Sequence, residues 1–304
     1  MKKYFLMFAI IVFFVLMLCF PNETFVGASN GLLLWFQTLL PTLLPFIIIS
    51  NLLVHTNAVS YISKVIHPFI QKFFSVSAHG SYAVLVGFLC GYPMGAKTVA
   101  DLIKTNKISL KEGQYLLSFC NNTSPMFIIS YIVMQNFNDE TYVLGVLGIL
   151  CMTPMLCSLI FKRFYNMSII NSQDKNEKEP FTFCFDIFDS CIMNGFDTIT
   201  RIGGYVILFS VLFSLSQKLP VKWLLPTLEI SNGIPMILNL GLPFVVSFPY
   251  VLALTSFGGF CAIAQTYSMI SETKLKIFPY IIQKLITALV TSLFAIIYIQ
   301  FIHQ

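Results

Sequence analysis

The segment GYPMGAKTVAD, residues 91–101, interrupts an apolar run that otherwise has the character of a membrane-spanning helix. It places Gly91, Pro93 and Gly95 within five residues of one another. Glycine permits a tight reversal of the backbone and proline removes a hydrogen-bond donor, so the pattern predicts a broken helix. Non-helical backbone at membrane depth is tolerated only where protein buries it or water hydrates it. The motif therefore predicts a re-entrant helical hairpin over residues 81–103, with its tip near the middle of the bilayer.

Composition supports a membrane location. Hydrophobic residues make up 57% of the 304 residues and charged residues only 10%, whereas soluble domains carry about 25% charged residues. The eight cysteines show neither CxxC nor His-linked spacing, so we expect no metal site and no disulfide framework. No P-loop, HExxH, GxSxG or paired-carboxylate motif is present, and we expect no catalytic residues, no cofactor and no enzyme. No basic run with interleaved aromatic residues suggests nucleic acid.

The apolar runs predict an all-α integral membrane protein with about six full spans and two re-entrant hairpins, since about 20 apolar residues cross the hydrocarbon. The N-terminal run Tyr4–Phe20 is longer than the core of a secretory signal, so we expect an uncleaved first span with its basic end inside. The mixed stretch 57–74 is expected to lie along the interface. The other spans, hairpins and broken helices are expected at 31–54, 81–103, 114–135, 142–161, 192–216, 243–270 and 277–302.

The two halves of the chain resemble each other. Residues 91–108 align with residues 258–275, with a glycine at the head of each. Similar halves in opposite orientation, each with a glycine-interrupted segment, are the arrangement of secondary transporters built from inverted repeats. The second hairpin is therefore expected over 243–270, turning at SFGGF (256–260). These assignments give an anchor helix and outer loop (1–30), a first repeat with a connecting span (31–161), a cytoplasmic polar loop (162–184) and a second, inverted repeat (185–304).

The positive-inside rule supports the first hairpin better than the second. A hairpin at the first motif returns the basic loop 104–112 to the side of Lys2 and Lys3, and it places the acidic segment 135–140 outside. When the loops of the second half are assigned to alternate sides in the same way, four lysines lie outside, which the rule does not favour. They are lysines 218, 222, 274 and 276.

The segment FCNNTSPMF, residues 119–127, predicts a second break. Thr123 or Ser124 as N-cap, with a proline at the first helical position, is a start signal for a new helix. We therefore expect two half-helices that meet at Asn121 and Asn122. Adjacent amides in hydrocarbon are costly unless they are bonded. These two amides either contact a solute or form hydrogen bonds between helices.

Other polar groups have a functional and a structural interpretation. The hairpin tip either offers a helix N-terminus to anionic or hydroxyl groups, or only packs against the other half. Lys97 lies in the first turn after the tip, where Asp101 can pair with it. Asp197 and Arg201 have the same spacing within one span, and they either neutralise each other or serve in gating or binding. Glu229 in the motif LEISNG is either a rim residue or a partner for a cation or substrate.

The candidate solute site combines the hairpin tip, the breaks and these charged groups. We expect the lipid bilayer and a polar small solute as partners, and the sequence leaves open whether the chain forms a homo-oligomer. The candidate residues are Gly91, Tyr92, Pro93, Gly95, Lys97, Asn121, Asn122, Thr123, Ser124, Asp197, Arg201, Glu229, Ser256, Gly258, Gly259 and Gln265.

Six motifs in order resemble the YlbJ-type sporulation integral membrane proteins, whose halves belong to the nucleoside recognition, or Gate, group. They are LLPTLLPFIIISNLL, GYPMGAK, SFCNNTSPMFI, IGGYVILFSVL, LEISNG and SFGGFCAIAQ. The sequence is more distantly similar to the concentrative nucleoside transporters, whose hairpins and broken helices line a nucleoside site. It implies a multi-pass protein of the bacterial cell membrane with a role in sporulation, through spore cortex formation, and it implies no established substrate.

Two functions follow from this resemblance and from the breaks together. The first is a transporter-like carrier of a polar small solute, bound between the tip and the breaks. The second is a membrane assembly factor for spore maturation that does not transport and acts through protein contacts.

Overall fold

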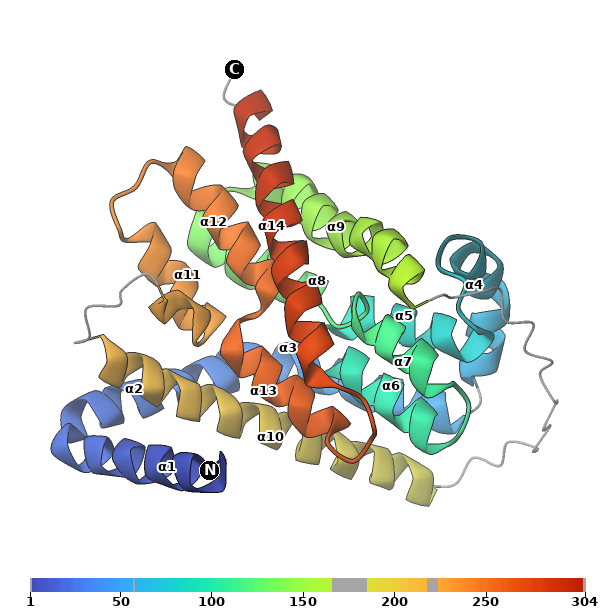
Figure 1. Ribbon diagram of the computed structural model, residues 1–304, viewed down its shortest axis with the longest axis horizontal. Coiled ribbons are helices and arrows are strands. Elements are labelled where there is room, and N and C mark those ends of the chain that lie inside the picture. The colour runs from blue at the N-terminus through green and yellow to red at the C-terminus, as the bar shows by residue number, and fades with distance from the viewer. Residues whose placement is uncertain (1, 57, 166–184, 218–223, 303–304) are drawn as a thin grey trace.

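The computed structural model describes residues 2–56, 58–165, 185–217 and 224–302. Every regular element in these ranges is helical (Figure 1), which confirms the all-α prediction. Five helical segments of the described residues are long and apolar enough to cross a bilayer, or six if one bent pair counts as a span. The five are Pro21–Leu53, Glu140–Phe164, Phe185–Ser216, Phe244–Ile270 and Ile277–Ile302.

Short breaks divide the helical chain into many pieces. In chain order, the α-helices are α1 (Lys2–Cys19), α2 (Pro21–Leu34), α3 (Leu40–His55), α4 (Ala58–Phe74), α5 (Ala78–Cys90), α6 (Met94–Lys104), α7 (Leu110–Leu117), α8 (Pro125–Phe127), α9 (Val143–Phe164), α10 (Phe185–Ser216), α11 (Ile230–Leu238), α12 (Phe244–Phe257), α13 (Gly259–Ile270) and α14 (Ile277–Ile302). The π-helical and 3₁₀ segments are η1 (Trp35–Leu39), η2 (Ile128–Phe137), η3 (Glu140–Tyr142) and η4 (Leu225–Thr227).

The segment 21–30, expected as an outer loop, is helical instead. Pro21 is tolerated in the first turn of α2. Further along, a Cβ on Gly31 would lie 2.8 Å from the Cα of Ile207, so α2 and α10 pack closely. Glycines four residues apart permit such contact between membrane helices, and Gly27 is the other member of the pair. The spacing of Gly27 and Gly31 was a sequence signal for a helix in this segment, but the polar composition of the segment had suggested a loop.

Replacing Gly31 with valine should force α2 away from α10. Overpacking of this kind costs about 2 kcal/mol, which corresponds to about 5 °C in melting temperature. The neighbouring Asn30 is exposed, so Asn30→Val is a matched control and should leave the melting temperature unchanged. Thermal unfolding of both variants in detergent micelles is the measurement, and equal melting temperatures would contradict the close packing.

The helical reversal predicted at GYPMG is confirmed, whereas the re-entrant position of its tip in the bilayer stays a prediction. Helices α5 and α6 pack against each other across a three-residue tip at 91–93. The start of α5 also contacts the next helix, because the backbone N–H of Ser77, just before α5, donates to Glu112 Oε1 in α7 at 2.6 Å. Gly91 at the tip has φ +76°, a conformation that side chains other than hydrogen rarely adopt.

The second predicted hairpin is wrong. Helices α12 and α13 are interrupted at Gly258, but they continue as one segment, Phe244–Ile270, that is long enough to span a bilayer. Figure 1 shows α13 leading on from the end of α12, while α14 returns beside α12. Gly258, at φ +84°, therefore interrupts the helix without reversing it. The alignment that placed Gly91 over Gly258 fails, since the two glycines serve different geometries.

This correction removes the unfavourable position of two of the four lysines, residues 274 and 276. Lys104 Nζ lies 2.5 Å from Glu272 Oε2 in the α13–α14 loop. The backbone N–H of Lys276 donates to Gln114 Oε1 at 2.8 Å. The hydrogen bond from Lys104 is the main reason that the pKa of Glu272 is lowered. The basic loop that follows α6 and the lysines of the α13–α14 loop, one of which is Lys274, therefore share one side of the protein, as the positive-inside rule prefers.

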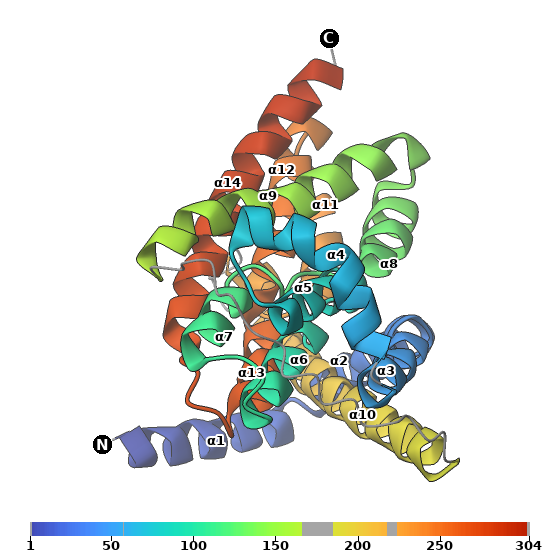
Figure 2. The same cartoon turned by 90° about the vertical axis from the view of Figure 1, so that its right-hand side faces the viewer.

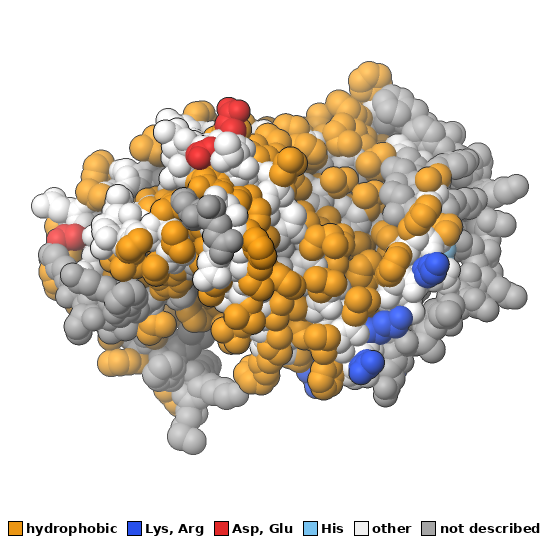
Figure 3. All heavy atoms as spheres, turned by 90° about the horizontal axis from the view of Figure 1, so that it is seen from above, with side chains coloured by type: hydrophobic (Ala, Val, Ile, Leu, Met, Phe, Trp, Pro, Cys, Tyr) orange, Lys and Arg blue, Asp and Glu red, His pale blue; other side chains and the backbone are white. Residues whose placement is uncertain are grey.

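The surface confirms a membrane environment. Large apolar side chains point outward, such as Leu144, which is 84% exposed, and Leu289, which is 67% exposed. Figure 3 shows hydrophobic side chains spread over the face seen there, with the few charged ones toward its margins. Next to the hairpin, α4 and α5 meet at an angle of 94°. This geometry does not test the interfacial position predicted for residues 57–74.

Several predictions lie outside the described residues. The polar loop was expected at 162–184, and its residues 166–184 lie outside the described residues. Lysines 218 and 222 lie outside them as well. The N-terminal helix is described as α1, close to its predicted bounds of 4–20. The four-part division of the chain and the inverted relation of its halves stay predictions.

Candidate functional site

The hairpin tip and the 118–124 break meet in the interior. The backbone N–H of Tyr92 donates to the carbonyl oxygen of Asn122 at 2.6 Å. A Cβ on Gly91 would lie 2.6 Å from the backbone nitrogen of Ser124. As predicted, Ser124 is the N-cap of the next helix, because its hydroxyl accepts from the N–H of Phe127 at 3.3 Å. The tip of one element therefore packs directly on the break of another.

Asn121 ties three helices to this break. Its Oδ1 accepts from the backbone N–H of Ala96 in the first turn of α6 at 3.2 Å. Its Nδ2 donates to Thr266 Oγ1 in α13 at 2.8 Å and to Tyr280 OH in α14 at 3.0 Å. The side chain is fully buried. Of the two roles left open by the sequence, hydrogen bonding between helices is the one that the structure contains.

The neighbouring polar side chains also have partners within the protein. Asn122 Nδ2 donates to the carbonyl oxygen of Phe119 at 2.5 Å. Thr123 Oγ1 donates to the carbonyl oxygen of Thr255, near the end of α12, at 3.0 Å. The two interrupted segments of the chain are thus bonded directly to each other.

The break at Gly258 packs against the segment that leads into α11. Gly259 has φ +78°, and a Cβ there would lie 2.9 Å from the carbonyl oxygen of Thr227. The backbone N–H of Cys261 donates to the carbonyl oxygen of Leu228 at 3.0 Å. These contacts bring the LEISNG motif into the protein interior.

Glu229 is buried rather than placed at a rim, with 4% of its surface exposed. It is the N-cap of α11, and its Oε2 accepts from the backbone N–H of Asn232 at 2.8 Å. The side-chain amide of Asn232 also donates to it at 3.1 Å. A carboxylate is favoured at a helix N-terminus because of the exposed N–H groups and the helix dipole. The same N–H groups hold the carboxylate in a fixed orientation.

A cavity of about 30 Å³ lies where these elements converge. Its polar lining comes from the tip, the 118–124 break, the start of α11 and α13, namely Tyr92, Thr123, Ser124, Glu229, Ser231 and Gln265. Its apolar lining includes Ile202 and Val206 of α10. A cavity needs roughly 10–15 Å³ to hold one water molecule. In this conformation the cavity therefore has space for about two waters.

Gln265 gives the cavity an unusual acceptor. Its side chain is 3% exposed, and its Oε1 has no hydrogen-bond partner among the residues that the structure describes. The amide nitrogen of the same side chain donates only weakly, to Cys261 Sγ at 3.3 Å. Since buried polar atoms are normally bonded, this oxygen, in a cavity that Glu229 also lines, can accept a hydrogen bond from water or solute.

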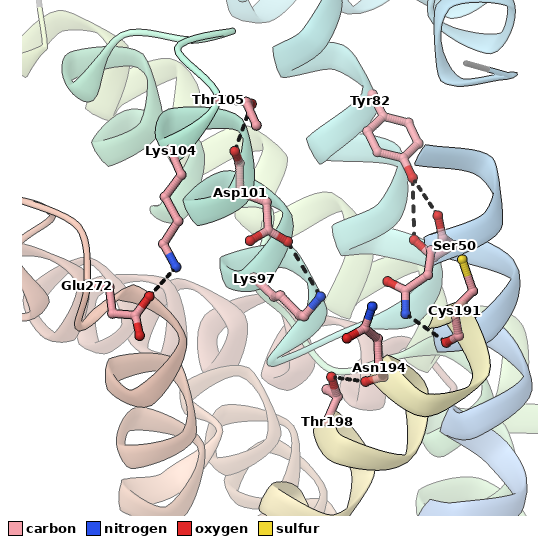
Figure 4. Close-up of polar contacts among 11 residues, drawn as sticks. Ser50, Tyr82, Lys97, Asp101, Lys104, Thr105, Cys191, Asn194, Thr198 and Glu272 are labelled. Carbon is pink, nitrogen blue, oxygen red and sulfur yellow. Dashed lines mark hydrogen bonds and ion pairs between the residues drawn. The ribbon is translucent and has the colours of Figure 1, made fainter. Parts of the chain in front are cut away.

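Other predicted site residues lie away from this cavity. Lys97 pairs with Asp101 at 3.5 Å on the partly exposed face of α6 (Figure 4), as their spacing predicts. Asp197 and Arg201 are exposed on α10, and no ion pair joins them among the residues that the structure describes. Ser256 is buried, but its hydroxyl accepts from Thr291 instead. Pro93 and Gly95 belong to the hairpin tip and first turn, where they shape the backbone.

Two important residues were missed by the sequence analysis. Lys284 in α14 is 2% exposed, and its Nζ donates to Asn122 Oδ1 at 2.9 Å. It is the single charged residue within Ile277–Ile302, and an ionisable residue within a span is a functional signal by itself. Ser231 lines the cavity, and its carbonyl oxygen accepts from the hydroxyl of Tyr131. Its sequence context gave no comparable signal.

Comparison with known proteins supports the predicted resemblance. Residues 36–140 match the family model Gate, described as nucleoside recognition. The chain is 25% identical, over 321 aligned positions, to the sporulation integral membrane protein YlbJ of Bacillus subtilis (strain 168), and the match covers 91% of this chain and 78% of that protein. No solved structure matches the chain. These matches confirm the resemblance that the six motifs predict.

Proposed function

We propose that this integral membrane protein is a carrier of a polar small solute, with its solute site at the cavity between the hairpin tip and the two breaks. The observation that carries the proposal is the composition of that cavity. A buried carboxylate, an unpaired amide oxygen and several hydroxyls converge from four separate segments. The amide oxygen of Gln265 would be costly in a purely structural interior, because a buried polar atom must find a partner there.

The size of the cavity constrains the mechanism. Ligand pockets for metabolites have volumes of roughly 300–1,000 Å³, whereas this cavity has about 30 Å³. We therefore assign the described conformation to a closed state without room for a metabolite. A solute as large as a nucleoside requires the hairpin tip to move away from the breaks, which alternating access provides.

Glu229→Gln tests the solute site. Nucleosides are the first class to examine, given the description of the matching family, and tritiated uridine in proteoliposomes is the probe. Removing the charge should lower uridine uptake at least about tenfold, since hydrogen bonds to charged groups contribute about 1.5–3 kcal/mol. The exposed Glu140 provides the control, and Glu140→Gln should transport like wild type.

The outcome separates the two candidate functions. If wild type takes up uridine and the Glu229→Gln variant takes it up equally well, the solute site lies elsewhere in the protein. If wild type takes up neither uridine nor labelled amino acids or cell-wall precursors, the carrier proposal is wrong.

The alternative is an assembly factor that acts through protein contacts, and one observation favours it. The amides of Asn121 and Asn122, for which the sequence left both solute contact and hydrogen bonding between helices open, are bonded within the protein. Expression of the chain in a Bacillus subtilis strain that lacks YlbJ tests this function, with the yield of heat-resistant spores as readout. Full complementation by Glu229→Gln, combined with no transport, would establish the assembly role.

The proposal includes a location and a set of partners. We place the protein in a bacterial cell membrane with its N-terminus in the cytoplasm, and we assign it a role in sporulation. The shared position of the basic loops supports this orientation, because lysine-rich loops remain on the cytoplasmic side. We propose neither enzymatic activity nor nucleic-acid binding.

A further inference from the structure

Lys284 occupies the junction between the two broken helices. Its Nζ donates to Asn122 Oδ1 at 2.9 Å and to the carbonyl oxygen of Ser256 at 3.2 Å. Asn122 lies in the 118–124 break, and Ser256 lies in the last turn of α12. The side chain of Lys284 is 2% exposed, so the ammonium depends on these oxygens rather than on bulk water.

No carboxylate balances this buried charge within the described residues. The ion pairs found there are Lys97–Asp101 and Lys104–Glu272, both of which involve exposed side chains. The titratable groups that face the ammonium are the Cys120 thiol and the Tyr280 ring, whose centroid is 5.9 Å from Nζ. Stabilisation therefore comes from neutral oxygens and from the negative end of the α12 dipole. A buried cation with only such partners is unusual, because removal from water costs several kcal/mol.

Amide and carbonyl oxygens at helix breaks and helix C-termini are the ligands that hold Na⁺ in membrane carriers. We propose that the Lys284 ammonium is a tethered cation that fills a monovalent-cation site formed by these oxygens. The protein then needs no free Na⁺ or K⁺ to hold its two breaks together. The inference concerns the resting structure, so it stands whether or not the chain transports a solute.

Lys284→Ala should empty this site and open it to a free ion. The purified variant is compared with wild type by thermal unfolding in equal concentrations of NaCl, KCl and choline chloride. We expect wild type to melt at the same temperature in all three salts. The variant should melt lower in choline and regain about 5 °C or more in Na⁺ or K⁺ when the ion is well above its Kd.

Lys284→Met is the matched control, because methionine fills the space without charge. It should be less stable than wild type and should respond equally to all three salts. The double variant K284A/N122D adds a carboxylate to the vacated site, and it should show a larger ion-specific rise than Lys284→Ala. If Lys284→Ala yields too little folded protein, the double variant still allows the ion dependence to be measured.

Three results would overturn the proposal. One is an ion-specific stabilisation of wild type that equals that of Lys284→Ala. Another is identical melting of both alanine-containing variants in Na⁺, K⁺ and choline. The third is failure of both to accumulate as folded protein in any of these salts, because a vacated cation site should be refilled by the ions of the medium. None of these measurements depends on transport, so the cation-site proposal can be correct even if the carrier proposal is wrong.

Discussion

Replacing Gly87 with alanine should prevent the chain from accumulating as a folded protein. A Cβ at this position in α5 would overlap the carbonyl oxygen of Cys120, and backbone atoms cannot rotate away as a side chain can. The hairpin would have to move off the 118–124 break, which also carries the bond between Tyr92 and Asn122. We expect a loss of about 3 kcal/mol or more, at the upper end of overpacking effects.

Helical glycines elsewhere in the chain serve as controls for Gly87→Ala. A Cβ on Gly148 of α9 or Gly204 of α10 would meet nothing within 4 Å. Alanine at either position should be neutral or stabilising by up to about 1 kcal/mol, since alanine favours helix over glycine. Yield of monodisperse protein and melting temperature are the measurements. A Gly87→Ala variant as stable as the Gly148→Ala control would show that the hairpin does not pack on the break.

Replacing Asn121 with leucine should have an effect of similar size by a different cause. The change removes three hydrogen bonds and leaves the N–H of Ala96 and the hydroxyls of Thr266 and Tyr280 without their partner. Each unsatisfied buried group costs about 1–3 kcal/mol, so the total should reach about 3 kcal/mol or more. Melting temperature and amide hydrogen exchange in α6 are the measurements.

Asn194→Leu is the control for Asn121→Leu, because Asn194 lies exposed on α10. It should leave both measurements unchanged. The comparison also decides between the two roles considered for Asn121. A variant that keeps the wild-type melting temperature and loses only uptake would give Asn121 a role in solute binding, contrary to its observed contacts.

The positions of the helix breaks were predictable from the sequence because their causes are local. Gly91, Pro93 and Pro125 restrict the backbone wherever they occur, and a serine before a proline caps a new helix. The last span was predicted with its observed bounds, Ile277–Ile302, since it has one apolar run between polar flanks. Two of the predicted site residues, Tyr92 and Glu229, line one cavity, and their role in solute binding stays a prediction.

Contacts between distant segments were not predictable in the same way. The burial of Glu229 depends on packing of the α11 segment against the break at Gly258, which the sequence does not encode locally. The partners of Lys284 come from residues 122 and 256, far away along the chain. Polar residues with local partners, such as Lys97 and Asp101, were easier to assign because helical spacing alone brings them together.

The sequence by itself determined that this chain is a helical membrane protein and that its helices are interrupted near Gly91, Asn121 and Gly258. Only the tertiary structure decided what each interruption does. The chain reverses at Gly91 because α5 and α6 pack on each other and on the 118–124 break, whereas it continues through Gly258 because α14 packs along α12. A glycine makes either path available to the backbone, and the free energy of packing the following helix selects between them.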